Sequence, residues 1–212
     1  MKKFLLVDDH HVVRSGLKGL LIELFSQPEV YEASTQEDAV EKLKQHQFEL
    51  VIMDIQIPGS DMLALMEFIH IKYPDTRVLV FSMSSEQIYA TRFLKAGAKG
   101  FVSKDSSFEE VKKAIALILN DRRYISDTLA QILADETAAD GKPNPFNKLS
   151  IREFEIINLL LAGQTVTDIG NALNLHTSSV GTFKMRIFKK LKVNNILELN
   201  EMARSYNFIK KA

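Results

Sequence analysis

Short apolar runs, separated by segments with helical periodicity, constrain the first part of this chain more than any other feature. Five strands are plausible, near residues 3–7, 29–33, 49–53, 77–81 and 100–102, and all but the second contain such a run. Near-continuous apolar runs of this length are typical of parallel strands buried on both faces. The segments between and after them predict helices near residues 11–25, 36–46, 61–72, 85–96 and 107–119. This alternation predicts an α/β doubly wound five-stranded parallel sheet of the flavodoxin-like kind, with right-handed crossovers.

Charged and hydroxyl side chains follow four of these predicted strands. They are Asp8 and Asp9 after the first strand, Asp54 after the third, Ser82 at the end of the fourth and Lys104 after the fifth. Because the carboxyl ends of parallel strands meet at one edge of a sheet, we expect these side chains to converge. Clustered carboxylates repel one another unless a cation joins them, and oxygen-only ligands suit Mg²⁺. An ammonium and a hydroxyl beside that metal suit a phosphoryl group.

The chemistry of each side chain predicts its role. Asp54 is the candidate nucleophile, because a carboxylate can attack phosphorus and form an acyl phosphate. Asp8 and Asp9 would hold the Mg²⁺ with Asp54 and the backbone carbonyl of Gln56. The lysine would pair with one phosphoryl oxygen, and the serine hydroxyl would donate to another.

Structural readings compete with these roles. A lone Asp after a strand is usually a helix cap or a turn former, but four such strand ends together are hard to explain structurally. His10 and His11 we interpret as the start of a helix rather than as metal ligands, because oxygen ligands already suffice.

The C-terminal part of the chain predicts four short helices. Capping boxes at Ser150 and Thr165 open the first two, Thr177 or Ser178 can cap the third, and the fourth covers roughly 195–206. Two short helices joined by a tight turn, the second of them basic, describe a helix-turn-helix. The formal net charge is −3 for residues 1–120 and +4 for residues 149–212, which suggests that the C-terminal part meets a polyanion.

One face of the third of these helices is predicted to contact DNA. Val180, Phe183, Ile187 and Leu191 fall at core spacing and leave the opposite face free. Close approach of the backbone to DNA would explain a glycine inside a helix, where it costs ~1 kcal/mol relative to Ala. A weak local helix propensity is the alternative explanation of this glycine, and a solvated helix face is the alternative explanation of the basic residues around it. The candidate DNA-contacting residues are Ser178, Ser179, Gly181, Thr182, Lys184, Met185, Arg186, Lys189 and Lys190.

Motifs in both parts resemble a known family. Val7-Asp8-Asp9-His10, Met53-Asp54-Ile55-Gln56, Phe81-Ser82 and Ser103-Lys104-Asp105 resemble the receiver domain of bacterial response regulators. Leu149-Ser150-Ile151-Arg152-Glu153, Gly163, Ile169 and Lys190-Leu191 resemble the LuxR-type DNA-binding domain. The whole chain therefore resembles the NarL/FixJ family. It has Gly181 and Phe183 where that family often has Lys and His, which suggests a different operator preference.

The resemblance implies a function and a domain organisation. Asp54 would accept a phosphoryl group from a sensor histidine kinase, and Ser82 and Phe101 would form a switch pair. We expect a receiver at 1–120, a linker at 121–147 and a LuxR-type helix-turn-helix domain at 148–212. The protein would be a phosphorylation-dependent transcriptional regulator of a two-component phosphorelay, not an enzyme. It would dimerise when phosphorylated or DNA-bound, with an interface drawn from Ile196, Leu197, Leu199 and Met202 unless these residues only close the core.

Some classes of protein are disfavoured, and two alternatives stay open. No apolar run reaches the ~18 residues that span a bilayer, and Asp8 comes too early for a secretory signal, so we expect a cytoplasmic protein without a membrane partner. The absence of cysteine excludes a disulfide scaffold and a thiolate metal site. One alternative is a magnesium-dependent phosphohydrolase, but such an enzyme usually needs a second Asp as its acid/base at the position that Gln56 occupies here. The other is a protein-binding module that needs no phosphate, against which the intact acid set argues.

Overall fold

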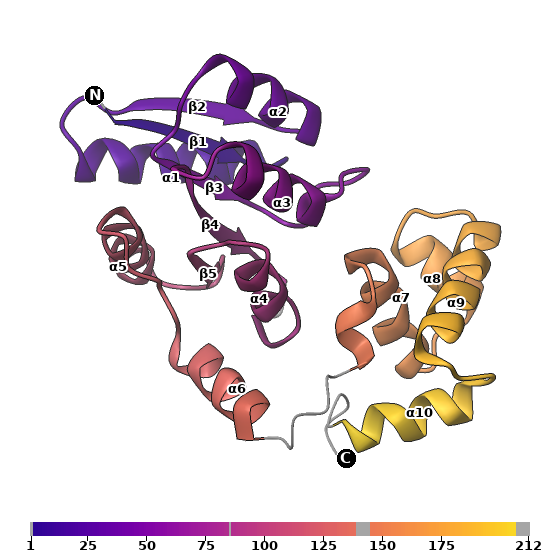
Figure 1. The fold of residues 1–212 in the computed structure, drawn as a ribbon. Coiled ribbons are helices and arrows are strands. Elements are labelled where there is room, and N and C mark those ends of the chain that lie inside the picture. The colour runs from indigo at the N-terminus through magenta and orange to yellow at the C-terminus, as the bar shows by residue number, and fades with distance from the viewer. Residues whose placement is uncertain (1, 85, 139–144, 207–212) are drawn as a thin grey trace. The chain divides into compact units, whose positions relative to one another are not determined.

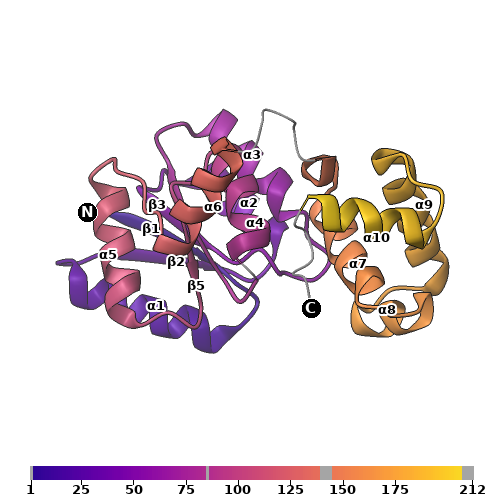
Figure 2. The same ribbon diagram turned by 90° about the horizontal axis from the view of Figure 1, so that it is seen from below.

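The structure, a computed structural model, describes residues 2–84, 86–138 and 145–206 and forms two compact units (Figures 1 and 2). Among the helices in these ranges, none combines the length and the apolar character that a bilayer span requires. The division falls between helix α6 (Asp127–Ala138) and the 3-10 helix η1 (Pro145–Lys148). The first unit contains β1 (Lys3–Val7), α1 (His11–Leu24), β2 (Glu29–Ala33), α2 (Gln36–Gln45), β3 (Leu50–Met53), α3 (Met62–Lys72), β4 (Arg77–Ser82), α4 (Glu86–Lys95), β5 (Gly100–Ser103), α5 (Phe108–Leu119) and α6 (Asp127–Ala138).

The five strands form one parallel sheet, as the apolar runs predict, and their order is β2-β1-β3-β4-β5. The neighbouring pair β1 and β3 places Val7 opposite Met53. The backbone N–H of Asp54 donates to the carbonyl oxygen of Val7 at 2.8 Å, so the chain leaves both strands at the same level. The pair β4 and β5 places Ser82 opposite Ser103. Strand pairing alone therefore brings the predicted site residues to one edge.

Helices cover both faces of the sheet. Figures 1 and 2 show α1 and α5 next to each other on one face, where their apolar sides pack on alternate residues of the strands. Leu20 and Ile115 are among the helical residues in this layer, and Leu6 and Ile52 are among the strand residues. The strand residues between them, such as Val80 and Phe101, point to the opposite face. A sheet buried on both faces explains why its strands read as continuous apolar runs.

Helix α6 belongs to the first unit because it packs against α4. The Ser126 hydroxyl accepts the backbone N–H of Leu129 at 3.0 Å and donates to Glu86 Oε1 of α4 at 2.6 Å. Burial raises the pKa of Glu86, and the hydrogen bond from Ser126 opposes that effect. The segment 121–147, which the sequence predicts as a linker, therefore contains a helix over Asp127–Ala138. Residues 139–144 of the predicted linker lie outside the described residues.

The second unit is helical, as predicted. It contains η1 (Pro145–Lys148), α7 (Ile151–Leu161), α8 (Val166–Ala172), α9 (Thr177–Leu191) and α10 (Ile196–Ser205). Both predicted capping boxes are present, at Ser150 with Glu153 and at Thr165 with Asp168. The prediction that Thr177 or Ser178 caps α9 is wrong. The helix already begins at Thr177, so His176 takes the N-cap position, without a side-chain hydrogen bond.

A buried glycine fixes the turn between α8 and α9. The carbonyl oxygen of Gly170 accepts the backbone N–H of Leu175 at 2.8 Å, which folds the turn back onto α8. A Cβ added at Gly170 would lie 2.8 Å from the carbonyl oxygen of Leu175. That contact is too short for any side chain, so the turn of this helix-turn-helix needs glycine at this point.

We therefore expect Gly170→Ala to destabilise the chain by about 1–3 kcal/mol, the usual cost of forcing extra atoms into a packed site. Urea unfolding followed by far-UV circular dichroism measures this change. Gly181→Ala is the matched control, because a Cβ there meets nothing within 4 Å. Since alanine is the better helix former, that variant should gain up to ~1 kcal/mol. Equal stability of the two variants would show that the turn tolerates a side chain at Gly170.

Candidate functional site

The predicted acids and the lysine meet at the carboxyl edge of the sheet. Lys104 Nζ lies 2.7 Å from Asp8 Oδ2 and 2.7 Å from Asp54 Oδ2, so one ammonium bridges two carboxylates that follow different strands. Both carboxylate side chains are 3% exposed, and that of Lys104 is 9% exposed. The convergence that strand order predicted is therefore present in the structure.

Asp54 is held by hydrogen bonds on both carboxylate oxygens. Its Oδ1 accepts the Ser82 hydroxyl at 2.6 Å and the backbone N–H groups of Ile55 at 2.6 Å and Gln56 at 3.1 Å. Its Oδ2 accepts the ammonium of Lys104. These donors fix the rotamer of a buried, charged side chain, which a nucleophile needs before a substrate arrives.

The charges at this edge do not balance. Burial alone would lower the pKa of Lys104, but its hydrogen bonds to Asp54 and Asp8 outweigh that effect and raise the pKa. One firmly charged ammonium thus faces two buried carboxylates, and Asp9 adds a third, more exposed one. An excess of negative charge in a confined site favours binding of a further cation.

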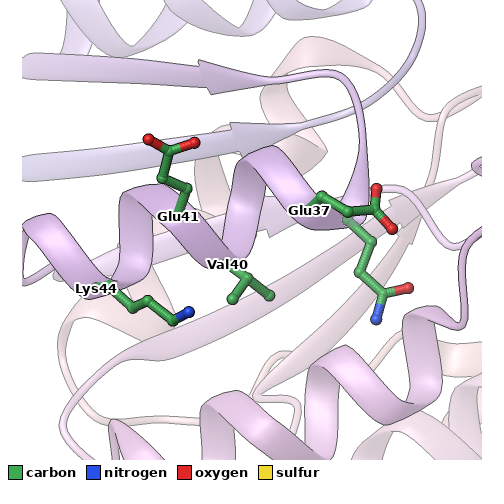
Figure 3. Close-up of a pocket in the computed structure, with 5 residues that line it drawn as sticks. Glu37, Val40, Glu41 and Lys44 are labelled. Carbon is green, nitrogen blue, oxygen red and sulfur yellow. The ribbon is translucent and has the colours of Figure 1, made fainter.

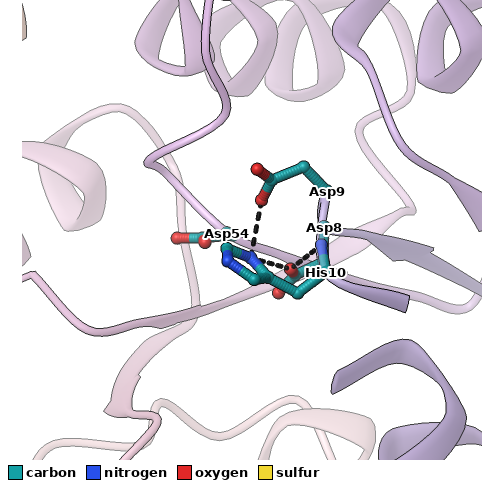
Figure 4. Close-up of side chains that lie close together, drawn as sticks. All are labelled: Asp8, Asp9, His10 and Asp54. Atoms are coloured by element: carbon teal, nitrogen blue, oxygen red, sulfur yellow. Dashed lines mark hydrogen bonds and ion pairs between the residues drawn. The ribbon is translucent and has the colours of Figure 1, made fainter. Parts of the chain in front are cut away.

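Four side chains at this edge could hold that cation. One donor atom each from Asp8, Asp9, His10 and Asp54 lies within 4.8 Å of the others (Figure 4). The carboxylate oxygens are donors that Mg²⁺ prefers, so the residues present fit this ion. His10 is the N-cap of α1, as its place at a helix start predicts, but its ring makes no capping bond. Instead the ring turns toward the carboxylates, which the sequence did not indicate.

A shallow hollow elsewhere on the first unit does not resemble a site. It lies along α2 and is lined by Gln36, Glu37, Val40, Glu41 and Lys44 (Figure 3). Its side chains project from a single helix, and none of the predicted site residues is among them. The chemistry of the first unit is therefore at the acidic edge of the sheet.

The predicted DNA-contacting face of α9 has a mixed exposure. Val180, Ile187 and Leu191 are buried as predicted, while Phe183 is only partly buried. Met185 is 69% exposed, so its side chain is accessible to a ligand of the helix. Exposed or partly exposed residues on the rest of the helix are Ser178, Ser179, Gly181, Thr182, Lys184, Arg186, Lys189 and Lys190.

Lys190 also has a partner within its own unit, which sequence reasoning missed. Its Nζ lies 2.6 Å from Glu153 Oε2, and that carboxylate side chain is 4% exposed. Burial would raise the pKa of Glu153, but the hydrogen bonds from Lys190 and from the backbone N–H of Ser150 lower it overall. The capping box at Ser150 predicted Glu153 as a cap but carried no signal for its long-range partner. This ion pair ties α9 to the first turn of α7.

Comparison with known families gives matches to both units. The family described as "Response regulator receiver domain" matches residues 4–116. The family described as "Bacterial regulatory proteins, luxR family" matches residues 147–203. The chain belongs to the NarL/FixJ-type response regulators. Receiver domains of this class bind Mg²⁺ at an acidic pocket, and this response regulator presents an acidic cluster at the corresponding edge.

Relatives of this response regulator match it over nearly their whole length. Response regulator UvrY of Escherichia coli is 32% identical over 204 residues, which cover 96% of this chain and 94% of UvrY. Response regulator GacA of Pseudomonas aeruginosa is 32% identical over 213 residues, which cover all of both chains. RcsB of Salmonella enterica serovar Typhimurium, solved bound to a promoter with a phosphomimetic, has a TM-score of 0.60 over 97% of this chain and 98% of its own. Its identity of 23% shows the fold alone.

The candidate switch residues of this response regulator are both buried. Ser82 has no exposed surface, and Phe101 is 1% exposed. The backbone N–H of Ser84 donates to the Ser82 hydroxyl at 3.3 Å, while the Ser84 hydroxyl is buried without a hydrogen-bond partner among the described residues. A buried hydroxyl without a partner costs free energy, so the loop after β4 has an unused hydrogen-bond donor beside Ser82.

Helix α10 of this response regulator divides between core and surface. Leu199 is buried, so it closes the core of the second unit. Leu197 is 71% exposed, and Ile196 and Met202 are partly exposed. Three of the four residues predicted for a dimer interface thus keep surface that a second copy could cover.

We expect Lys190→Ala to destabilise the response regulator by about 1 kcal/mol at neutral pH, because it leaves the buried Glu153 carboxylate with one donor fewer. The loss is small because the lysine side chain is 41% exposed, and solvent screens the ion pair. The folded-state pKa of Glu153 lies below its ordinary 4.5, so this contribution is present above that pH and is lost as the pH falls through the folded pKa.

Thermal unfolding of wild type and Lys190→Ala across the acid range measures the difference. The two curves should converge as the pH drops below about 4.5. Lys189→Ala is the control, because no ion pair of Lys189 is found among the described residues. A constant gap between wild type and Lys190→Ala at all pH values would contradict the role of the ion pair.

Proposed function

We propose that this response regulator accepts a phosphoryl group on Asp54 from a sensor histidine kinase and thereby controls its dimerisation and its binding to promoter DNA. The observation that carries the proposal is the bridge from Lys104 to both Asp54 and Asp8 beside the Ser82 hydroxyl. This set supplies a buried carboxylate nucleophile with a cation and a hydroxyl donor for the phosphoryl oxygens.

The chain's own residues can be assigned to the transfer. An Asp54 carboxylate oxygen attacks phosphorus, the bond from phosphorus to the kinase histidine nitrogen breaks, and that nitrogen keeps the electron pair. Oδ2 is the better candidate for the attacking oxygen, because Oδ1 accepts two backbone N–H groups that hold it in place. Lys104 then exchanges its bond to Oδ2 for one to a phosphoryl oxygen, and Ser82 turns its hydroxyl to another.

Asp8, Asp9, Asp54 and the backbone carbonyl of Gln56 would hold a Mg²⁺ ion at this edge. When bound, the ion would offset the charge repulsion between the carboxylates and the incoming phosphoryl oxygens. The signal would then pass through Ser82 and Phe101, whose strands pair directly. Phosphorylation adds negative charge at Asp54, and a charge that favours one of two conformations of these side chains is sufficient for such a switch.

The second unit would supply the output. We propose that Thr182 and Met185 contact base edges in the major groove, with Ser178, Ser179 and Gly181 close to the backbone of the duplex. Lys184, Arg186 and Lys189 would contact phosphates. Lys190 is engaged by Glu153 and would position the helix more than it binds DNA. RcsB has been solved as two dimers bound to two parallel DNAs, which supports a dimeric DNA-bound form. The exposed Leu197 supports α10 as the interface of that dimer.

The remaining assignments follow from this role. We propose a receiver at 1–120, a linker at 121–147 whose helix α6 packs against α4 of the first unit, and a DNA-binding domain at 148–212. A regulator of chromosomal promoters acts in the cytoplasm. Its activity is transcriptional regulation rather than catalysis, because the exposed Gln56 carries no acid or base for hydrolysis of the acyl phosphate.

We expect the wild-type chain to form an acid-stable, base-labile adduct when it is incubated with acetyl phosphate and Mg²⁺. Asp54→Asn should not form it, because an amide oxygen is a poor nucleophile, and Lys104→Ala should form less. Mass spectrometry of the intact chain measures the added phosphoryl group. Undiminished labelling of Asp54→Asn would remove Asp54 from its role, and DNA binding that never responds to the phosphodonor would favour a phosphate-independent module.

We expect Lys189→Ala to weaken binding to any duplex and to reduce the slope of log affinity against log salt by about 1, as loss of one phosphate contact does. Lys190→Ala should leave that slope nearly unchanged. Gly181→Ala should weaken DNA binding without loss of stability, since its Cβ is free of contacts within the chain. Fluorescence anisotropy on labelled promoter fragments at several salt concentrations measures both effects. An unchanged slope in Lys189→Ala would show that this helix faces elsewhere.

A further inference from the structure

The position of the His10 ring points to a role in choosing the metal ion. His10 Nδ1 lies 2.8 Å from Asp9 Oδ1 and 3.2 Å from Asp8 Oδ1 (Figure 4). The backbone N–H of His10 also donates to Asp8 Oδ1 at 2.8 Å, which anchors the residue beside the carboxylates. Three consecutive residues thus present an imidazole nitrogen and two carboxylate oxygens to the same small space.

The spacing of these atoms fits a shared metal ion. Neighbouring ligands around an octahedral ion at 2.0–2.2 Å lie about 3 Å apart, and both measured separations from Nδ1 are close to that value. The His10 side chain is 65% exposed, so an ion can reach the ring from solvent. A neutral imidazole with its proton on Nε2 leaves a lone pair on Nδ1 for the metal.

We propose that His10 is a metal ligand of this response regulator and that its nitrogen makes the site prefer Mn²⁺, or a similar transition-metal ion, over Mg²⁺. The inference rests on the proposed acidic metal site and adds a donor to it. Imidazole binds first-row transition metals more tightly than it binds Mg²⁺, which prefers oxygen ligands and retains its waters. The identity of the bound cation would then depend on His10 as well as on the carboxylates of Asp8, Asp9 and Asp54.

The same distances also fit a model in which the His10 ring competes with the cation for the carboxylates. The ring could occupy the place of the cation as a hydrogen-bond donor to the carboxylates and leave when an ion binds. Removing His10 would then tighten binding of Mg²⁺ and Mn²⁺ alike. A ligand predicts the reverse for Mn²⁺ and little change for Mg²⁺, so one pair of titrations separates the two readings.

The test uses the full chain with Mn²⁺ and Mg²⁺ as probes. Isothermal titration calorimetry should show that His10→Ala lowers the preference for Mn²⁺ over Mg²⁺ by roughly tenfold. His11→Ala is the matched control: it is the exposed first residue of α1, next in sequence, and lies outside the cluster. Electron spin-echo envelope modulation of bound Mn²⁺ should show a coordinated imidazole nitrogen in wild type and His11→Ala but not in His10→Ala.

Each other outcome has a defined meaning. Bound Mn²⁺ without nitrogen modulation overturns the ligand role of His10, and so does tighter binding of both ions by His10→Ala. If Asp54 is still phosphorylated in those cases, the proposed function stands and only this inference fails. Absence of bound cation together with absence of labelling by acetyl phosphate overturns both.

Discussion

Two buried carboxylates that share one ammonium are the interaction on which the rest of this structure depends. Asp8 and Asp54 reach each other because β1 and β3 are neighbours, and Lys104 reaches both from the end of β5. Without the ammonium, two charges with 3% exposure would repel in a low-dielectric site. The contact therefore requires β1 and β3 to be neighbours in the sheet. It also leaves one ammonium against two carboxylates, and this excess of negative charge favours binding of a cation, which in turn allows a phosphoryl group to approach.

The first unit could be predicted from sequence almost completely, and the reason is physical. A chain that alternates apolar runs with amphipathic helices is expected to form a doubly wound parallel sheet. The predicted strand ends accordingly agree with the observed ones to within about a residue. Site residues at strand ends follow from the same argument, because sheet topology brings them together whatever the loops do. The contact of His10 with the acidic cluster could not be predicted in this way, because the sequence pattern at a helix start does not indicate the direction of a side chain.

Long-range polar contacts mark the limit of the sequence argument. The pair of Lys190 and Glu153 joins residues 37 positions apart, and neither position is unusual on its own helix. The same holds for Ser126 and Glu86, which are 40 positions apart and hold α6 to α4. Capping patterns and periodicity describe neighbours in sequence, whereas these contacts depend on how helices pack. Gly170 is a similar case, since only the folded turn shows what a Cβ would meet.

Helix α4 joins the site to the end of the first unit. It begins four residues after Ser82, whose hydroxyl donates to Asp54, and its first residue, Glu86, accepts the hydroxyl of Ser126. The same serine caps the first turn of α6. The backbone N–H of Ser84, in the loop between β4 and α4, also donates to the Ser82 hydroxyl, so a rotation of that hydroxyl toward a phosphoryl oxygen would weaken this bond. Hydrogen bonds at Ser82 and at Ser126, with α4 between them, thus form a continuous path from Asp54 to the first turn of α6 within the first unit.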